Sequence, residues 1–309
     1  MGRVATKDST PSRPRSSAKT QAQKRLAGQR ALAAAGGNRS SRRRRLFITL
    51  SPIVAVVVVV AVLIGARLGS ASGSPASGQS VTPASAAVVG EVTAVPATVL
   101  NTVGAGSVTT LPTAITGTPL TAANGQPQIL YVGAEYCPYC AAERWGVVVA
   151  LSRFGTFANL GATASSPSDV YPSTATFTFH GASYTSSQLA FSAVETQSNQ
   201  VVNGSYTPLD TLSAADQALM TKYDPSGGIP FIDIGGKFLI SGASYSPAVL
   251  QGKTQAQIAA ALTDPTSAIA KAIDGTANVI TAAVCASTGN QPASVCTAPG
   301  VVAAAARLP

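Results

Sequence analysis

Histidine is nearly absent from this sequence, which leaves little basis for a Ser/His/Asp catalytic triad. The 309 residues include one histidine, His180, and no Ser/His/Asp arrangement is evident. Phosphate-binding loops are also missing, because no glycine-rich stretch carries the required Lys-Ser or Lys-Thr pair. His180 closes an expected strand just before Gly181. We therefore interpret it as an exposed turn residue.

Cysteine is scarce as well, and its distribution argues against a metal site. The chain has four cysteines, all of them beyond residue 136. Zinc takes about four ligands, and ten residues separate the last two cysteines, Cys285 and Cys296. That spacing does not resemble a zinc knuckle. We expect no metal and no other cofactor.

Acidic residues are missing from the N-terminal tail, which holds most of the positive charge. Residues 1–45 carry thirteen Lys or Arg and one acid, Asp8, whereas the remainder carries eight bases and eleven acids. We interpret 1–45 as a mostly disordered cytoplasmic tail, whose charges orient a membrane segment or attract anionic lipid. No aromatic residue is interleaved to stack on bases, so nucleic acid is not an expected partner.

Charge is absent altogether from residues 46–64, which are dominated by Val, Ile, Leu and Ala. Such a run is long enough to cross a bilayer of roughly 30 Å at about 1.5 Å per residue, and we place a membrane helix at 46–66. Four arginines at 42–45 precede it and Arg67 follows it. The positive-inside rule then predicts a cytoplasmic N-terminus and an extracytoplasmic C-terminal domain. A cleaved signal peptide is the alternative, but its apolar run usually spans only roughly 7 to 15 residues.

The remaining chain divides into a spacer and one folded domain. Residues 67–90 are rich in Ser, Ala, Gly and Pro, which indicates a flexible linker. The domain is expected over 91–309, a length that suffices for a substantial core. All cysteines follow the membrane segment, and this placement fits an oxidising compartment outside the cytoplasm.

The most informative stretch ends in the sequence Cys-Pro-Tyr-Cys, residues 137–140. An apolar run over 129–133 favours a β-strand, and the residues after the second cysteine favour a helix over 141–151. The dithiol thus lies at a strand-to-helix turn, where the free amides and dipole of the helix stabilise a thiolate. Cys137 is the predicted nucleophile and Cys140 the resolving thiol. A static disulfide or half of a metal site are the alternatives.

The other expected elements describe an α/β fold. We expect strands over 128–133, 174–180 and 188–195. A Gly-Gly pair at 235–236 indicates a two-residue hairpin between two further strands. We expect helices over 97–104, 213–223, 254–262 and 265–285. The last of these takes Asp264 as its N-cap and Pro265 as its first residue.

These elements, together with two short motifs, resemble the thioredoxin-like superfamily. The motifs are Ala-Glu-Tyr-Cys-Pro-Tyr-Cys at 134–140 and Gly-Ile-Pro at 228–230. With its basic tail and single span, the chain also looks like an uncharacterised family of membrane-anchored thioredoxin-like bacterial and archaeal proteins. The resemblance covers roughly residues 90 to 285. It implies a thioredoxin-like fold with a central mixed sheet flanked by helices.

The same resemblance implies how a substrate is held. Pro230 is expected in the cis form against the dithiol, so that the backbone of Ile229 pairs with an extended substrate segment. Main-chain hydrogen bonds of this kind hold a peptide without demanding a particular sequence. Tyr136, Tyr139 and Phe231 are then expected to rim the groove.

Two features depart from thioredoxin. Thioredoxin has a buried acid six residues before its first cysteine, and Tyr131 takes that place here. Glu135, Glu143 or water is then expected to assist proton transfer at the resolving thiol. The chain between the dithiol and the cis-proline is also longer than in thioredoxin, so we expect an insertion at 154–208.

The sequence therefore predicts a single-pass thiol–disulfide oxidoreductase of the cell membrane, acting outside the cytoplasm on thiols and disulfides of exported proteins. A membrane redox partner is a further expectation, and oxidation, isomerisation and reduction all stay open as its direction. Cys285 and Cys296 are expected to form a structural disulfide, with a second redox pair as the alternative. A non-catalytic binding or scaffolding domain with a structural disulfide is the competing function.

Overall fold

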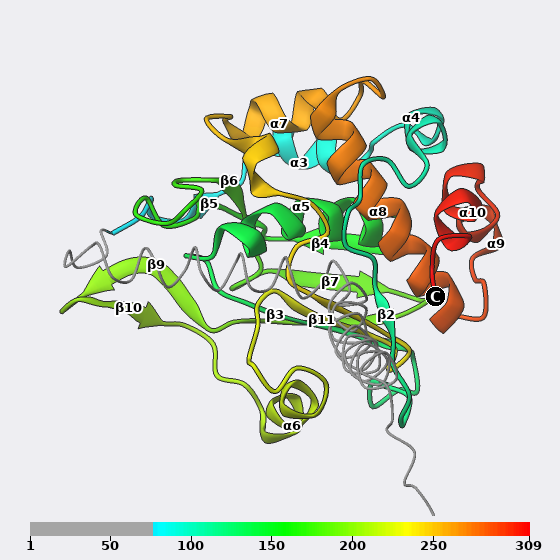
Figure 1. Ribbon diagram of the computed structural model, residues 1–309, viewed down its shortest axis with the longest axis horizontal. Helices are drawn as coiled ribbons and strands as arrows, with labels where there is room; N and C mark the ends of the chain where they lie inside the picture. Colours follow the sequence, from blue (N-terminus) through cyan, green and yellow to red (C-terminus); the bar gives the residue numbers. More distant parts are fainter. Residues whose placement is uncertain (1–76) are drawn as a thin grey trace, which may run out of the picture. The chain divides into compact units, whose positions relative to one another are not determined.

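The computed structural model describes residues 77–309, which include both cysteine pairs. The expected tail, the expected membrane helix and the first part of the spacer, up to residue 76, lie outside the described residues. Within them the chain forms a mixed α/β domain around a five-stranded sheet with helices on both faces (Figure 1). The predicted α/β class is confirmed.

The central sheet has the strand order β2-β12-β11-β3-β8. Its strands are β2 (Thr113–Ala114), β12 (Phe238–Ser241), β11 (Phe231–Ile234), β3 (Gln128–Gly133) and β8 (Ala190–Glu195). Only β3 and β8 are parallel neighbours, and the other pairs are antiparallel. The carboxyl ends of β3 and β8 therefore lie at the same end of the sheet.

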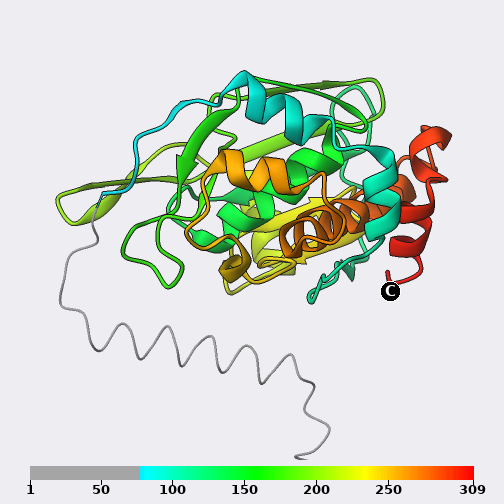
Figure 2. The same ribbon diagram turned by 90° about the horizontal axis from the view of Figure 1, so that it is seen from above.

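Helices cover both faces of this sheet. Two helices, α5 (Pro138–Leu151) and α8 (Ala268–Ser287), pack together on one face, and α6 (Ala214–Tyr223) lies on the other (Figure 1). Seen from above, α3 (Ala86–Thr93) and α7 (Gln255–Ala261) lie together over α5 (Figure 2). The remaining helices are α4 (Ala97–Val103), η1 (Pro247–Leu250), α9 (Ala293–Cys296) and α10 (Pro299–Ala305).

The strand β3 contributes to two hydrophobic cores, because its side chains alternate between the faces of the sheet. Ile129 and Tyr131 belong to the larger core, which includes residues of α5 and α8. Leu130 and Val132 belong to a smaller core, which includes Met220 of α6. Burial on both faces explains why this strand is a continuous apolar run in the sequence.

The predicted insertion at 154–208 is only partly an addition to the sheet. It contains β8, the parallel neighbour of β3, which is the strand expected over 188–195. An apolar run shows that a strand is buried but not which strand it pairs with. The added strands form three small sheets: β4 (Gly155–Ala158) with β7 (Ser183–Ser186), β5 (Gly161–Ala164) with β6 (Ala175–Thr178) and β1 (Thr82–Pro83), and β9 (Gln197–Val202) with β10 (Ser205–Pro208).

The folded domain begins earlier than the sequence predicts. The Ser85 side chain caps α3 by accepting the N–H of Val88 at 3.3 Å. Val88 and Val92 are buried against the larger core. The linker predicted at 67–90 therefore ends before β1, because its Ser- and Ala-rich composition gives no sign of the helix cap at Ser85 or of the buried Val88.

The long C-terminal helix α8 begins later than predicted. Ser267 is its N-cap, with its hydroxyl accepting the N–H of Ile269 at 3.1 Å. Asp264 instead accepts hydrogen bonds from the N–H and hydroxyl of Thr266, which closes a turn before the helix. Within residues 77–309, α8 is the only single helix long and apolar enough to cross a membrane, and most of it is buried in the domain; α3 and α4 qualify only as a bent pair.

The hairpin predicted at the Gly-Gly pair is present between β11 and β12. Gly235 and Gly236 have φ values of 65° and 69°, a region that side-chain-bearing residues seldom adopt. Ile234 pairs with Phe238, so three residues rather than two separate the paired ends. The carbonyl of the third residue, Lys237, accepts the N–H of Ile115, which follows β2.

Asp274 on α8 is a buried carboxyl that should make stability depend on pH. It is 0% exposed, and neither of its oxygens has a hydrogen-bond partner among the described residues. Burial raises the pKa of Asp274 to about 8, whereas an unfolded aspartate titrates near about 4. Between these two pKa values the folded state holds a proton that the unfolded state has lost. The free energy of unfolding therefore falls as the pH rises from the lower pKa to the higher one.

We expect Asp274→Asn to raise the free energy of unfolding by on the order of 5 kcal/mol at about pH 9, and by little at about pH 4. The amide keeps the shape of the protonated carboxyl and carries no charge. Chemical denaturation at the two pH values measures the difference. A variant that is less stable than the parent at both pH values would contradict this account.

Candidate functional site

The dithiol occupies the junction between β3 and α5 that the sequence predicts. Cys137 is the N-cap of α5, and Cys140 lies in its first turn. Both are free thiols, and Cys137 Sγ accepts the N–H of Cys140 at 3.2 Å. The sulfur thus takes one of the amides that a helix start leaves unpaired. Cys137 keeps 6% exposure whereas Cys140 has none, so Cys137 is the more accessible of the two thiols.

The two thiols differ in acidity in the direction that these roles need. Burial raises the pKa of Cys137, but hydrogen bonds from the thiol and N–H of Cys140, with the charge of Arg144, bring it below its ordinary value. Burial also raises the pKa of Cys140, and its hydrogen bond to Cys137 and the negative charge there raise it further. The thiolate is therefore favoured at Cys137.

The peptide bond between Ile229 and Pro230 is cis and lies against the dithiol, as the family resemblance predicts. The Ile229 carbonyl oxygen is 3.9 Å from Cys137 Sγ, although 92 positions separate the two residues in the chain. The sheet brings them together, because Phe231 of β11 pairs with Val132 of β3. Ile229 is half-buried beside the Cys137 thiol.

A buried ion pair near the dithiol is absent from the sequence-based prediction. Arg144 on α5 donates from Nε and Nη2 to the carboxylate of Glu195 on β8, at 2.8 and 2.7 Å. Both side chains are 0% exposed, and Nη2 also donates to the carbonyl of Ala134 at 2.8 Å. Arg144 follows Cys137 and Cys140 on one face of the helix, at the i+7 and i+4 positions. This spacing is the only feature of the sequence that places Arg144 near the dithiol.

Three buried polar atoms at this ion pair lack a hydrogen-bond partner among the described residues. They are Tyr131 Oη, Glu135 Oε1 and Arg144 Nη1. Tyr131 places its ring 5.9 Å from the Arg144 guanidinium carbon. Burial raises the pKa of Tyr131 well above its ordinary value and also raises the pKa of Glu135. The carboxyl of Glu135, two residues before Cys137, therefore keeps its proton to a higher pH than an exposed glutamate does.

Glu143, the other predicted proton carrier, binds a different part of the domain. Its two carboxylate oxygens accept the N–H and the hydroxyl of Ser244, each at 2.8 Å. Burial raises the pKa of Glu143 to about 7. The neighbouring Tyr245 donates its hydroxyl to the carbonyl of Ala142 at 2.7 Å. These contacts join α5 to the loop after β12 rather than to the thiols.

Tyr136 and Tyr139, on either side of Cys137, are each paired with a tyrosine from the segment that holds the added strands. Tyr136 stacks on Tyr206 of β10 with ring centroids 4.4 Å apart, and Tyr139 meets Tyr171 edge-on at 5.9 Å. All four are half-buried. Phe231, the third residue predicted for the rim, is instead 0% exposed. That prediction is wrong, because strand alternation directs this side chain into the smaller core.

The remaining residues with reactive side chains lie on other elements. Cys285 and Cys296 form the predicted disulfide, which joins α8 to α9. His180 is exposed, as predicted, and pairs with Asp210 at 2.7 Å. Residues 77–309 hold no group of three His, Cys, Asp or Glu side chains suited to a metal ion.

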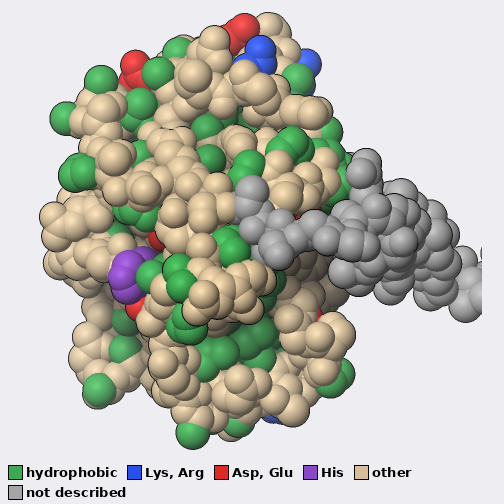
Figure 3. All heavy atoms as spheres, turned by 90° about the vertical axis from the view of Figure 1, so that its left-hand side faces the viewer, with side chains coloured by type: hydrophobic (Ala, Val, Ile, Leu, Met, Phe, Trp, Pro, Cys, Tyr) green, Lys and Arg blue, Asp and Glu red, His purple; other side chains and the backbone are tan. Residues whose placement is uncertain are grey.

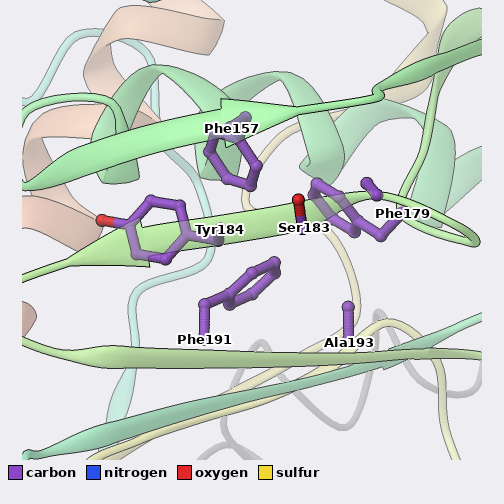
Figure 4. Close-up of a pocket in the computed structure, with 7 residues that line it drawn as sticks. Phe157, Phe179, Ser183, Tyr184, Phe191 and Ala193 are labelled. Carbon is purple, nitrogen blue, oxygen red and sulfur yellow. The ribbon is translucent and has the colours of Figure 1, made fainter.

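Figure 4 shows an aromatic hollow that is separate from the dithiol. Phe157 from β4, Tyr184 from β7 and Phe191 from β8 converge on it, together with Phe179. Its volume is about 80 Å³. None of its lining residues belongs to the dithiol site. A space of this size does not hold a polypeptide segment.

Comparison with known proteins gives one match. The family described as a domain of unknown function, DUF929, matches residues 114–226. This stretch includes the dithiol, the Arg144–Glu195 pair and most of the added strands, and it ends before the cis-proline. No curated protein matches the chain, and no solved structure does so either.

Proposed function

We propose that this protein is a thiol–disulfide oxidoreductase that acts through Cys137 and Cys140. The position of Cys137 Sγ carries the proposal, because it caps α5 and lies 3.9 Å from the Ile229 carbonyl oxygen. A helix start favours the thiolate that attacks disulfides. A backbone carbonyl beside the sulfur offers a hydrogen-bond acceptor to an extended substrate segment.

The proposed reaction consists of two thiol–disulfide exchanges. The Cys137 thiolate attacks one sulfur of a substrate disulfide, which releases the other sulfur as a thiolate and leaves a mixed disulfide. Cys140 then loses its proton and attacks the Cys137 sulfur, which releases the second substrate thiolate and closes the bond between the two cysteines. The substrate gains two electrons and the protein loses two. The reverse sequence oxidises a substrate dithiol.

Several features support a thioredoxin-like fold for this site. The parallel pair β3 and β8, joined through α5, precedes α6, and cis-Pro230, the β11–β12 hairpin and α8 follow. This is the order that the family resemblance implies. We further propose that residues 46–66 anchor the domain outside the cell membrane, that exported proteins are its substrates, and that a membrane protein restores its redox state. The disulfide between Cys285 and Cys296 supports an oxidising compartment.

Differential alkylation of the full-length protein in detergent tests the proposal. The protein is incubated with a small dithiol or a small disulfide and then treated with a thiol-alkylating reagent. We expect Cys137 and Cys140 to change state within minutes, and Cys285 and Cys296 to stay protected. If the first pair does not exchange, a binding or scaffolding domain with a static dithiol takes the place of the enzyme.

A further inference from the structure

A loop between two of the added strands lies directly against the dithiol turn. This β5–β6 loop comprises residues 165–174. Near its start, the N–H of Ser166 donates to the carbonyl of Tyr136 at 2.8 Å. Near its end, Tyr171 packs edge-on against Tyr139. The loop therefore contacts both tyrosines that flank the nucleophile.

Hydrogen bonds across its base hold the β5–β6 loop in one shape. The N–H of Ser165 donates to the carbonyl of Thr174, and the N–H of Thr174 donates back to the Ser165 hydroxyl, both at 2.9 Å. The Thr174 hydroxyl also donates to the carbonyl of Tyr171 at 3.0 Å. The residues at the tip, Asp169 and Val170, are thus presented by a loop that is already held in shape, which lowers the entropy cost of ordering it when a partner binds.

Asp169 carries a negative charge that has no cationic partner in the described part of the chain. Its carboxylate is half-buried and accepts the N–H of Val170 at 2.6 Å. Neither of the two ion pairs found in residues 77–309 includes it. Figure 3 shows the side of the domain from which β9 and β10 project, and Lys and Arg side chains are visible only near the upper and lower edges of that face.

We propose that Asp169 binds the ammonium or guanidinium group of a Lys or Arg that lies close to the cysteine in the polypeptide attacked by Cys137. The aromatic faces of Tyr139 and Tyr171 add cation–π attraction for such a group. Val170, which is 47% exposed, adds apolar contact for the aliphatic stem of the same side chain. The carboxylate repels acidic segments at the same position, which gives discrimination as well as affinity. This inference rests on the proposed oxidoreductase function and assigns it a substrate class.

Three matched peptides test this preference. Each contains one cysteine in a mixed disulfide with a coloured leaving thiol, and the peptides differ only in a neighbouring residue, which is Lys, Gln or Glu. We expect the reduced full-length protein in detergent to attack the Lys peptide about five to ten times faster than the Glu peptide at low salt. This ratio should fall toward one as the ionic strength approaches about 1 M. In Asp169→Asn the ratio should be close to one even at low salt.

The control Glu91→Gln removes the same charge from an exposed position on α3 and should keep the ratio of the parent. A parent ratio near one, or an unchanged ratio in Asp169→Asn, overturns the proposed subsite and leaves the oxidoreductase function standing. If Asp169→Asn does not fold, a preference of the parent that persists at high salt contradicts charge recognition. If the parent releases the coloured thiol from every peptide no faster than Cys137→Ser does, the oxidoreductase function itself is overturned.

Discussion

Replacing Cys140 with Ser is expected to trap the protein in covalent complexes with its substrates. Cys137 still attacks, but no thiol remains to release the mixed disulfide, so this intermediate accumulates. Membranes that contain the full-length Cys140→Ser protein are alkylated and analysed without reducing agent. Bands of higher mass that a reducing agent converts to the free protein report the trapped state. The trapped partners are the substrates, and basic residues close to their attacked cysteines would agree with recognition by Asp169.

Cys137→Ser is the matched control for this experiment, because it makes the same chemical change three residues earlier and removes the nucleophile instead. It should form no complexes, and its exchange rate should fall by about 10³-fold or more. The reason is the unequal exposure of the two cysteines, 6% for Cys137 and 0% for Cys140. Equal amounts of complex in the two variants would contradict the assignment of nucleophile and resolving thiol.

Replacing Arg144 with Met is expected both to raise the pKa of Cys137 and to destabilise the fold. The Arg144 charge lowers the pKa of both thiols, and its loss should raise that of Cys137 by about one unit. Glu195 is then a buried acid without its partner, which costs about 3–5 kcal/mol of unfolding free energy. At neutral pH the exchange rate should fall only about threefold, because a more basic thiolate is also a stronger nucleophile. Thiolate ultraviolet absorbance against pH and chemical denaturation measure the two effects.

Two further variants separate the charge of Arg144 from its packing. Glu195→Gln removes the opposing charge and leaves the guanidinium in place, so the pKa of Cys137 should fall rather than rise. Arg144→Lys keeps the positive charge but loses the two-pronged hydrogen bonding. In this variant the pKa of Cys137 should lie closer to that of the parent than to that of Arg144→Met. A rise of the pKa in both Arg144→Met and Glu195→Gln would show that loosened packing, rather than charge, controls the thiol.

Signals close together in the chain predict the dithiol end of the domain well. The apolar run of β3, the spacing of Cys137 and Cys140, and the helix start after them all lie within a few residues of one another. Helix caps act over a similarly short range, and Ser213 and Thr254 mark the starts of α6 and α7 in the sequence and in the structure. The cis bond before Pro230 is a different case, since only the resemblance to a family predicts it.

Contacts between distant segments are what the sequence does not reveal. Arg144 meets Glu195 because β8 lies parallel to β3, and no local pattern in the sequence between the two residues predicts this strand pairing. The β5–β6 loop, which carries Asp169, meets Tyr136 and Tyr139 of the dithiol turn, and it joins two strands that are too short for their period to be recognised. Phe231 follows the cis-proline and was expected at the groove, whereas its place in the alternation of β11 directs it inward.

The equilibrium reduction potential of the Cys137–Cys140 pair tests the central claim most directly. The full-length protein in detergent is equilibrated with thiol buffers of stepped potential, and the oxidised fraction is measured by alkylation. We predict a reversible two-electron transition between about −270 and −120 mV, absent from Cys137→Ser, with the disulfide between Cys285 and Cys296 intact throughout. A pair that stays in one state across this range would contradict the account, because a static dithiol would then explain the site.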